Sequence, residues 1–169
     1  MKKVCIINGS SNTGKDTLIT IFDKLTKQTV FNYSTIDNIR NVFRSLGYKG
    51  NRMEFKYRKL LSDIKSFLIE YDDIPFKDAV EQFKIYDYFT DNFIMFIHCR
   101  EPTEIKKLVD YFGDTCVTLL IKRNGLKTPD NKSDMNVDDY DYDYTILNTA
   151  GIKELEHHTL NLIKKLEET

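Results

Sequence analysis

Short, almost continuously apolar runs alternate along this chain with longer stretches in which apolar residues recur every three or four positions. The short runs predict buried strands, because a strand covered on both faces carries apolar side chains along its whole length. A weaker run at 29–33 predicts a further strand. The four stronger strands are predicted at residues 3–8, 93–99, 116–122 and 142–148. Buried strands of this kind are typical of a parallel sheet.

The longer stretches carry the spacing of amphipathic helices. The first covers 15–27, and its apolar residues share one face: Leu18, Ile19, Phe22 and Leu25. A second covers 103–113 and ends at Gly113, a residue typical of helix C-termini. Further helices are predicted at 38–46, at 54–71, after Pro75 and at 152–168. Strands that alternate with helices predict an α/β domain, in which right-handed crossovers place helices on both faces of a parallel sheet.

The composition narrows the classes of function. A chain of 169 residues suits one globular domain, and its formal net charge of −1 disfavours nucleic-acid binding, for which a basic surplus is usual. The apolar runs are shorter than the about 18 residues of a membrane span, and the first is too short for a signal peptide. The cysteines, Cys5, Cys99 and Cys116, lie far apart in apolar runs, as expected for reduced thiols. We therefore expect a cytoplasmic protein with no nucleic-acid or membrane partner, in an oligomeric state that the sequence does not specify.

The candidate chemistry begins where the first strand ends, because ligands of parallel sheets gather at the carboxyl ends of the strands. Residues 9–15 read G-x-x-x-x-G-K between a strand and a helix, which is the context of a phosphate-binding loop. Gly9 and Gly14 permit backbone angles that turn N–H groups toward phosphate oxygens, and the helix adds its positive end. Lys15 would reach the terminal phosphates as a point charge. We expect ATP to contact Gly9, Ser10, Ser11, Asn12, Thr13, Gly14, Lys15, Asp16 and Thr17.

Asp16 departs from the usual pattern, in which a serine or threonine after the lysine holds magnesium. A carboxylate is also a hard oxygen donor, so Asp16 suits Mg²⁺ either directly or through water. Its charge beside a polyphosphate would be unfavourable without the cation. We therefore expect nucleotide binding to depend strongly on Mg²⁺, with Thr17 as a further candidate ligand. The alternative is that Asp16 only complements the dipole of the helix at its first turn.

Two short matches to GTPase motifs are interpreted as chance. Residues 110–113 read D-x-x-G but lie within an amphipathic helix rather than at a strand end. Residues 131–134 read N-K-x-D but lie in a polar loop, well beyond the apolar run that should deliver them. The chain is therefore not predicted to be a GTPase switch.

The segment 34–40 resembles the P-loop nucleoside monophosphate kinases, in which S-T-x-D-x-[LI]-R follows the second strand. Ser34, Thr35, Asp37 and Arg40 match this pattern in order. The resemblance implies that Thr35 and Arg40 lie at the monophosphate of the acceptor, and a guanidinium suits this role because it bonds phosphate bidentately. From the residues alone an alternative stays open, in which Ser34 or Thr35 caps a helix and Arg40 is a solvated surface residue.

The end of the run at 93–99 resembles adenylate-kinase-like proteins, in which an arginine near a proline also binds the acceptor phosphate. Arg100 and Pro102 match this feature, so the resemblance implies a catalytic and acceptor-binding role for Arg100. The aspartate–glycine pair of that family is replaced here by His98 and Cys99. We hypothesise that the loss of this acidic residue is connected with the acidic character of Asp16.

Residues 122–141 resemble a short, lid-like loop that carries Lys127 and Lys132. A cationic loop that closes over the site would exclude water, and Arg123 is our candidate for stabilising charge on the transferred group. The alternative is a flexible surface loop with solvated charges. Residues 148–151 lie where these kinases pass a loop beside the base of ATP, with contacts mainly from the backbone.

Within this superfamily, G-K-D in place of G-K-[ST] most resembles the bacteriophage-type deoxynucleoside monophosphate kinases, and also the phosphomevalonate kinases of animals. The resemblance implies a three-layer P-loop fold over residues 1–169, with a five-stranded parallel sheet and an acceptor-binding helical region at about 34–90. It further implies Mg²⁺- and ATP-dependent phosphoryl transfer to a (deoxy)nucleoside monophosphate. Two alternatives stay open: a kinase of another small phosphorylated metabolite, and a nucleotide-binding protein without turnover.

Overall fold

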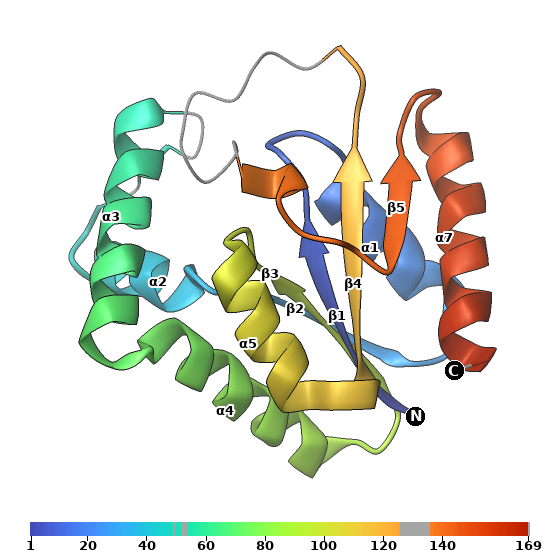
Figure 1. The fold of residues 1–169 in the computed structure, drawn as a ribbon, viewed down its shortest axis with the longest axis horizontal. Coiled ribbons are helices and arrows are strands. Elements are labelled where there is room, and N and C mark those ends of the chain that lie inside the picture. Colours follow the sequence, from blue (N-terminus) through green and yellow to red (C-terminus); the bar gives the residue numbers. More distant parts are fainter. Residues whose placement is uncertain (49, 52–53, 126–135, 169) are drawn as a thin grey trace.

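The computed structural model describes residues 1–48, 50–51, 54–125 and 136–168. Within these residues, five strands form one sheet in the order β2-β3-β1-β4-β5 (Figure 1). The strands are β1 (Lys2–Asn8), β2 (Thr29–Ser34), β3 (Phe93–His98), β4 (Cys116–Lys122) and β5 (Tyr144–Leu147). Every neighbouring pair is parallel. The predicted strands and the parallel sheet are therefore confirmed.

Helices lie in the predicted segments between the strands. α4 and α5 each begin with a proline in the first turn, a position where the missing N–H costs no helical hydrogen bond. The helices are α1 (Lys15–Leu25), α2 (Asp37–Ser45), α3 (Phe55–Asp72), α4 (Ile74–Phe89), α5 (Pro102–Phe112) and α7 (Ile152–Glu168), with short 3₁₀ helices η1 (Gly113–Thr115) and η2 (Asn136–Asp138). None of the helices in the described residues is both long enough and apolar enough to cross a membrane.

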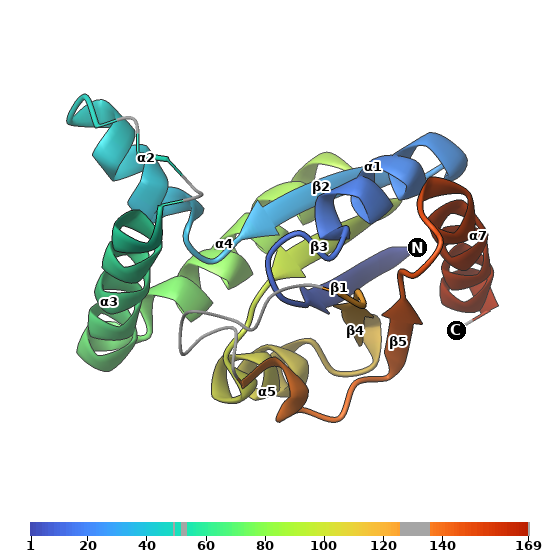
Figure 2. The same cartoon turned by 90° about the horizontal axis from the view of Figure 1, so that it is seen from above.

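Helices cover the sheet on both faces, as Figure 2 shows for α1 and α5. Successive residues of a strand point to opposite faces, so Ile7 of β1 packs in the core with α1 and α7, whereas Ile6 packs in the core with α4 and α5. The predicted apolar face of α1 is not covered along its whole length. Leu25, the last residue of α1, is 45% exposed, whereas Ile21 one turn earlier is buried, so the covered apolar face ends before the helix does.

α2 and α3 extend beyond the β2 edge of the sheet (Figure 2) and are called here the arm. The arm has a small core of its own, in which Ile39 of α2 packs with Tyr57 and Leu61 of α3. α4 instead packs on the sheet, where Ala79 and Val80 join the main core. The segment 34–90 therefore comprises a projecting part, the arm, and a helix that belongs to the main core.

The carboxyl ends of the five strands meet at one edge because the strands are parallel. His98 at the end of β3 pairs in register with Ile7 of β1 and with Ser34 of β2. Lys122 at the end of β4 pairs with Leu147 of β5. The segments that follow these strands are far apart in the sequence and are brought together at this edge, which is where the candidate site is built.

Candidate active site

The loop between β1 and α1 is shaped by glycines that approach the ends of two other strands. Gly9 has a φ of 141°, and a side chain there would clash with the carbonyl oxygen of Ile121 in β4. Gly14 has a φ of 108°, and a Cβ there would lie 2.7 Å from Nδ2 of Asn148, just after β5. Glycine is favoured at both positions by the backbone conformation, and at Gly9 also by the lack of space beside the backbone of β4. The predicted phosphate loop is thus held closely against the carboxyl edge of the sheet.

Hydrogen bonds within the loop fix its curvature. Thr13 Oγ1 donates to the carbonyl of Ser10 at 3.1 Å, and Asn148 Nδ2 donates to the carbonyl of Thr13 at 2.9 Å. The Lys15 ammonium lies over the loop and donates to the carbonyls of Gly9 and Ser10, the latter at 2.7 Å. An ammonium in this position can exchange these carbonyls for phosphate oxygens without leaving the loop.

A pocket of about 350 Å³ adjoins the loop. Its polar wall comes from the loop, from the first turn of α1 and from Arg123 after β4. Its apolar wall comes from Ile152 and Leu155 of α7. Arg123 also donates from Nη1 to the carbonyl of Asn12, at 3.4 Å. A polar loop beside an apolar wall suits a ligand with a phosphate tail and a flat, less polar body.

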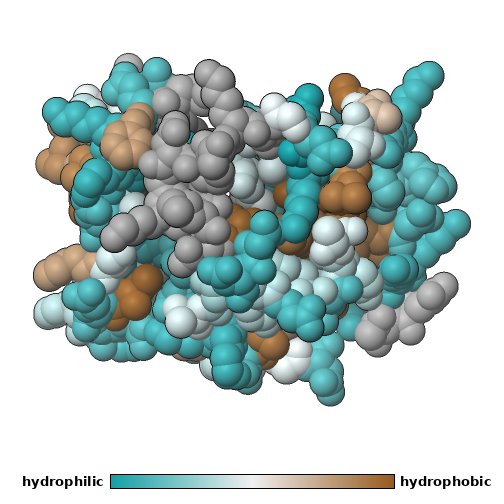
Figure 3. All heavy atoms as spheres, turned by 45° about the horizontal axis from the view of Figure 1, so that its top comes forward, coloured by the Kyte–Doolittle hydropathy of each residue, from teal (hydrophilic) through white to brown (hydrophobic). Residues whose placement is uncertain are grey.

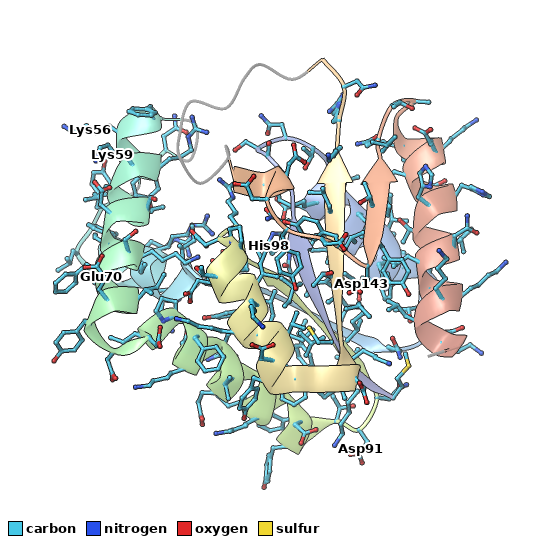
Figure 4. The ribbon with its side chains drawn as sticks, viewed as in Figure 1. Lys56, Lys59, Glu70, Asp91, His98 and Asp143 are labelled. Carbon is cyan, nitrogen blue, oxygen red and sulfur yellow. The ribbon has the colours of Figure 1, made fainter. Side chains whose placement is uncertain are left out.

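The view onto the carboxyl edge shows mainly hydrophilic surface with small, separate apolar groups (Figure 3). Two neighbouring residues at this edge are Asp16 and His98. Asp16, in the first turn of α1, has a carboxylate that is 79% exposed. Its Oδ1 lies 3.8 Å from Nε2 of His98, at the end of β3 (Figure 4). The acidic loop residue and the histidine that stands in place of an acidic strand end are therefore neighbours.

His98 is a neutral group at the centre of the site. Burial is the main cause that lowers its pKa to about 4; Asp16 opposes this shift, while the positive charges of Lys15 and Arg100 add to it. Its Nε2 lies 2.8 Å from Oδ1 of Asn32 in β2. Since the imidazole carries no charge at neutral pH, His98 does not compensate the charge of Asp16.

The carboxylate of Asp16 can bind Mg²⁺ only together with further oxygen ligands. In the described part of the chain, no group of three or more His, Cys, Asp or Glu side chains could hold a metal ion. A cation beside Asp16 would therefore take further oxygen ligands from the phosphates or from water, as Mg²⁺ commonly does. Thr17, which adjoins Asp16 at the pocket, offers a hydroxyl as a further oxygen.

Arg40 and Arg100, with the residues that hold them, form the region that is called here the acceptor side. Arg40 of α2 forms an ion pair with Asp37 at 2.9 Å, and its side chain is only 16% exposed. Asp37 also accepts the N–H of Ser34 at 2.9 Å. Thr35 is directed to the end of β3, because its N–H and its hydroxyl both donate to the carbonyl of His98. The contacts of Thr35 and Arg40 with an acceptor stay a prediction.

The backbone of Arg100 is held at both of its polar groups. Its carbonyl accepts from Nδ2 of Asn8 at 3.2 Å, and its N–H lies 3.4 Å from Oε2 of Glu101. Glu101 accepts a further hydrogen bond from Lys65 of α3, whose side chain is buried. Burial alone would raise the pKa of Glu101, but the ammonium of Lys65 holds it below its usual range. Glu101 is thus an anion that forms an ion pair with Lys65 of the arm.

The structure brings most of the predicted residues to one edge. The loop residues 9–17, Arg123, Arg100 and Arg40 all lie at or beside the ends of β1 to β4. Asp110 lies within α5 and pairs with Lys106, as expected for a chance match to a GTPase motif. Lys127, Lys132 and the segment 131–134 lie outside the described residues.

Two polar residues of the site, Asn8 and Lys65, were not predicted. For Asn148 the sequence predicted mainly backbone contacts, whereas its side chain donates to the carbonyl of Thr13. Asn8 and Asn148 are polar side chains directly after apolar runs, and both are buried. This position at a strand end is a signal that sequence alone offers. Lys65 stands among other charged residues of an amphipathic helix, so only the packing of α3 distinguishes it.

No protein-family model matches this sequence, and no curated protein matches it. Among solved structures, a "putative kinase" from Chloroflexus aurantiacus J-10-fl is similar over 99% of this chain and 97% of its own, with a TM-score of 0.54 and 13% identity. A shikimate kinase from Aquifex aeolicus VF5 covers 96% of each chain with a TM-score of 0.48 and 12% identity. An APS kinase from Mycobacterium tuberculosis covers 99% of this chain and 98% of its own, with a TM-score of 0.46 and 15% identity. The last two are too distant to support an argument. The first, with the five-stranded parallel sheet, shows the fold: the chain shares with that structure a parallel α/β sheet covered by helices on both faces.

Proposed function

We propose that this protein transfers the γ-phosphoryl group of ATP to a (deoxy)nucleoside monophosphate. The observation that carries the proposal is the loop of residues 9–15. It follows β1, begins α1, has glycine at both ends of its curve and lies beneath the ammonium of Lys15. This arrangement of backbone amides, a helix N-terminus and one cation suits a polyphosphate.

The donor side follows from the chemistry of the loop. Its amides and Lys15 would hold the phosphates of ATP, and the apolar wall of Ile152 and Leu155 would lie beside the base. Mg²⁺, when bound, would supply positive charge that offsets the negative charge of the phosphates during transfer. Asp16 is the proposed ligand of this cation, directly or through water. Arg123, which lines the pocket, is the proposed group for neutralising charge on the transferred group.

The acceptor side supports a phosphorylated acceptor. Arg40 pairs with Asp37, whose charge acts on His98 at the end of β3, as does the charge of Arg100. A guanidinium fork bonds phosphate bidentately. An oxygen of the acceptor phosphate would form a bond to the γ-phosphorus while the bond from that phosphorus to the bridging oxygen breaks, leaving ADP. Such a nucleophile is already ionised, so positioning and charge neutralisation are sufficient. The match of residues 34–40 to the nucleoside monophosphate kinases favours a nucleotide as acceptor.

The test is ATP consumption by the purified protein with a panel of ribo- and deoxyribonucleoside monophosphates, with Mg²⁺ and with EDTA. We expect turnover with at least one of them, and only with the cation. If turnover occurs only with other phosphorylated metabolites, the acceptor has been assigned to the wrong class of compound. The assignment of the ATP site would still hold. Tight ATP binding without turnover would show a nucleotide-binding protein instead.

Asp16→Ser provides a matched variant for the metal, because it restores the neutral oxygen ligand usual in such loops. We expect the variant to turn over and to bind ATP with a weaker dependence on Mg²⁺ than the wild type. An unchanged dependence in calorimetric titrations of ATP, with and without Mg²⁺, would contradict the assignment of Asp16.

A further inference from the structure

Asn8, the last residue of β1, carries a fully buried polar side chain at the start of the phosphate loop. Its Oδ1 accepts the N–H of Gly9 at 2.7 Å, and its Nδ2 donates to the carbonyl of Arg100 at 3.2 Å and to the hydroxyl of Tyr142 at 2.6 Å. The orientation of the amide is fixed by its partners, because the N–H of Gly9 can only donate and the carbonyl of Arg100 can only accept. Both polar atoms of this buried amide are therefore hydrogen-bonded, and the amide fits its partners in one orientation only.

The peptides that Asn8 joins belong to the two sides of the site. Gly9 opens the loop that would hold the donor phosphates, and Arg100 carries a guanidinium of the acceptor side. Since Glu101, held by Lys65 of α3, lies at the N–H of Arg100, the backbone of Arg100 is held on both sides of its Cα atom. The chain of contacts thus runs from the phosphate loop through Asn8 to the arm.

Tyr142 extends the same network. Its hydroxyl accepts from Asn8 and donates to the carbonyl of Val137 in η2, at 3.0 Å. Burial is the main cause that raises the pKa of Tyr142 to about 12, so the hydroxyl keeps the proton that it donates. Asn8 therefore contacts three separate segments that surround the site.

We propose that Asn8 is a positioning residue that sets the distance between the phosphate loop and Arg100, and so aligns the acceptor phosphate with the γ-phosphate. The inference rests on the proposed function, because alignment matters only if a group is transferred between the two sides. In-line transfer is sensitive to placement, and a displacement of about 1 Å can lower a rate by about 100-fold. Asn8 itself need not touch either substrate.

The test compares Asn8→Ala with two other variants. Tyr142→Phe removes only the link to η2 and leaves Asn8 bonded to Gly9 and Arg100. Thr118→Val is the control for stability, because it removes a buried hydroxyl near the amino-terminal end of β4 that bonds to Asp143 (Figure 4), away from the carboxyl edge.

For Asn8→Ala we expect kcat to fall about 100-fold while KM for ATP stays within about threefold. Tyr142→Phe should lower kcat by less than about tenfold, and Thr118→Val should lower Tm with kcat within about twofold. The proposal is overturned if Asn8→Ala keeps the wild-type kcat, or if its loss of kcat is matched by Thr118→Val at equal Tm. It is also overturned if the whole effect lies in KM for ATP.

Hydrogen–deuterium exchange separates a failure of this inference from a failure of the proposed function. If the wild type transfers a phosphoryl group to no acceptor, the proposed function has failed. Hydrogen–deuterium exchange still tests whether Asn8 holds the phosphate loop and Arg100 together. Asn8→Ala should raise exchange rates about tenfold or more at residues 97–101, whereas Thr118→Val should not. Unchanged exchange at 97–101 in Asn8→Ala would overturn the role of Asn8 whether or not the protein is a kinase.

Discussion

The phosphate loop takes its shape mainly from the backbone, whereas the acceptor side beside it takes its shape from charged side chains. Gly9 and Gly14 allow the loop to lie against β4 and to meet the side chain of Asn148 after β5, so its geometry is set by residues that are contiguous in the sequence. On the acceptor side, Arg40 is held by Asp37, and the backbone of Arg100 is held by Asn8 and Glu101. These residues come from β1, from α2 and from the segment between β3 and α5.

This difference has a physical consequence for each side. Backbone amides and glycine contacts cannot be replaced by another residue, because any side chain at Gly9 meets the carbonyl of Ile121. Ion pairs can be rearranged, since another cation or anion of similar reach would satisfy the same partner. We therefore expect substitutions in the loop to affect the donor step severely, and substitutions on the acceptor side to act on one substrate at a time.

The largest effect is expected from Lys15→Ala. Lys15 is the cation that lies over the loop, and its loss removes charge from the place where the donor phosphates would bind. Turnover in the phosphoryl-transfer assay should fall by about 1,000-fold or more. Lys24→Ala, in the last turn of the same helix and exposed, should leave turnover within about twofold. Comparable losses in the two variants would show that the helix, not the loop cation, matters.

The next largest effect is expected from Gly9→Ala, and it is an effect on stability. The φ of 141° at Gly9 is unfavourable for alanine, and its Cβ would press on β4, so the free energy of unfolding should fall by about 3 kcal/mol. Gly47→Ala is the matched case, because Gly47 has a φ of 81° but open space around it. That variant should lose only about 1 kcal/mol. Equal losses in denaturant titrations would mean that the approach of the loop to β4 is not a constraint.

Arg40→Ala addresses the acceptor side alone. We expect KM for the acceptor to rise about 30-fold, as for loss of a charge-assisted pair of hydrogen bonds, with KM for ATP unchanged. Arg44→Ala removes an exposed arginine one turn later on α2, whose Nη1 donates to Asn41. It should leave both constants unchanged. If Arg40→Ala and Arg44→Ala behave alike in steady-state kinetics, the acceptor pocket has been assigned to the wrong place.

The same contrast explains what the sequence could and could not predict. The strands, the helices and the loop at residues 9–15 follow from local patterns, because hydrophobic spacing and glycine positions act over a few residues. The ion pair between Lys65 and Glu101 joins α3 to the end of β3, and no local pattern relates two residues so far apart. Asn8 was missed for another reason. A polar residue at a strand end usually faces solvent, and only packing shows that this one is buried and fully bonded.

His98 lies where the two sides meet, next to Asp16 of the loop and bonded through its carbonyl to Thr35, and it offers the mildest test. Its pKa is lowered from 6.5 to about 4, chiefly by burial, so below pH 6.5 the unfolded chain binds a proton that the folded protein does not. The contribution of His98 to stability is therefore complete above pH 6.5 and is lost as the pH falls toward 4. From pH 7 to pH 6 this amounts to a loss of about 0.7 kcal/mol in the free energy of unfolding.

His98→Asn should remove that part of the pH dependence in denaturant titrations without nucleotide or metal, whereas His157→Asn, at an exposed histidine of α7, should retain it. A pH dependence in His98→Asn equal to that of the wild type would mean that the imidazole takes up protons as freely in the folded protein as in the unfolded chain. His98 would then carry positive charge at mildly acidic pH and pair with Asp16. At that pH the charge of the loop carboxylate would be compensated before any cation arrived, so the dependence of the loop on Mg²⁺ should be weaker in mild acid than at neutral pH.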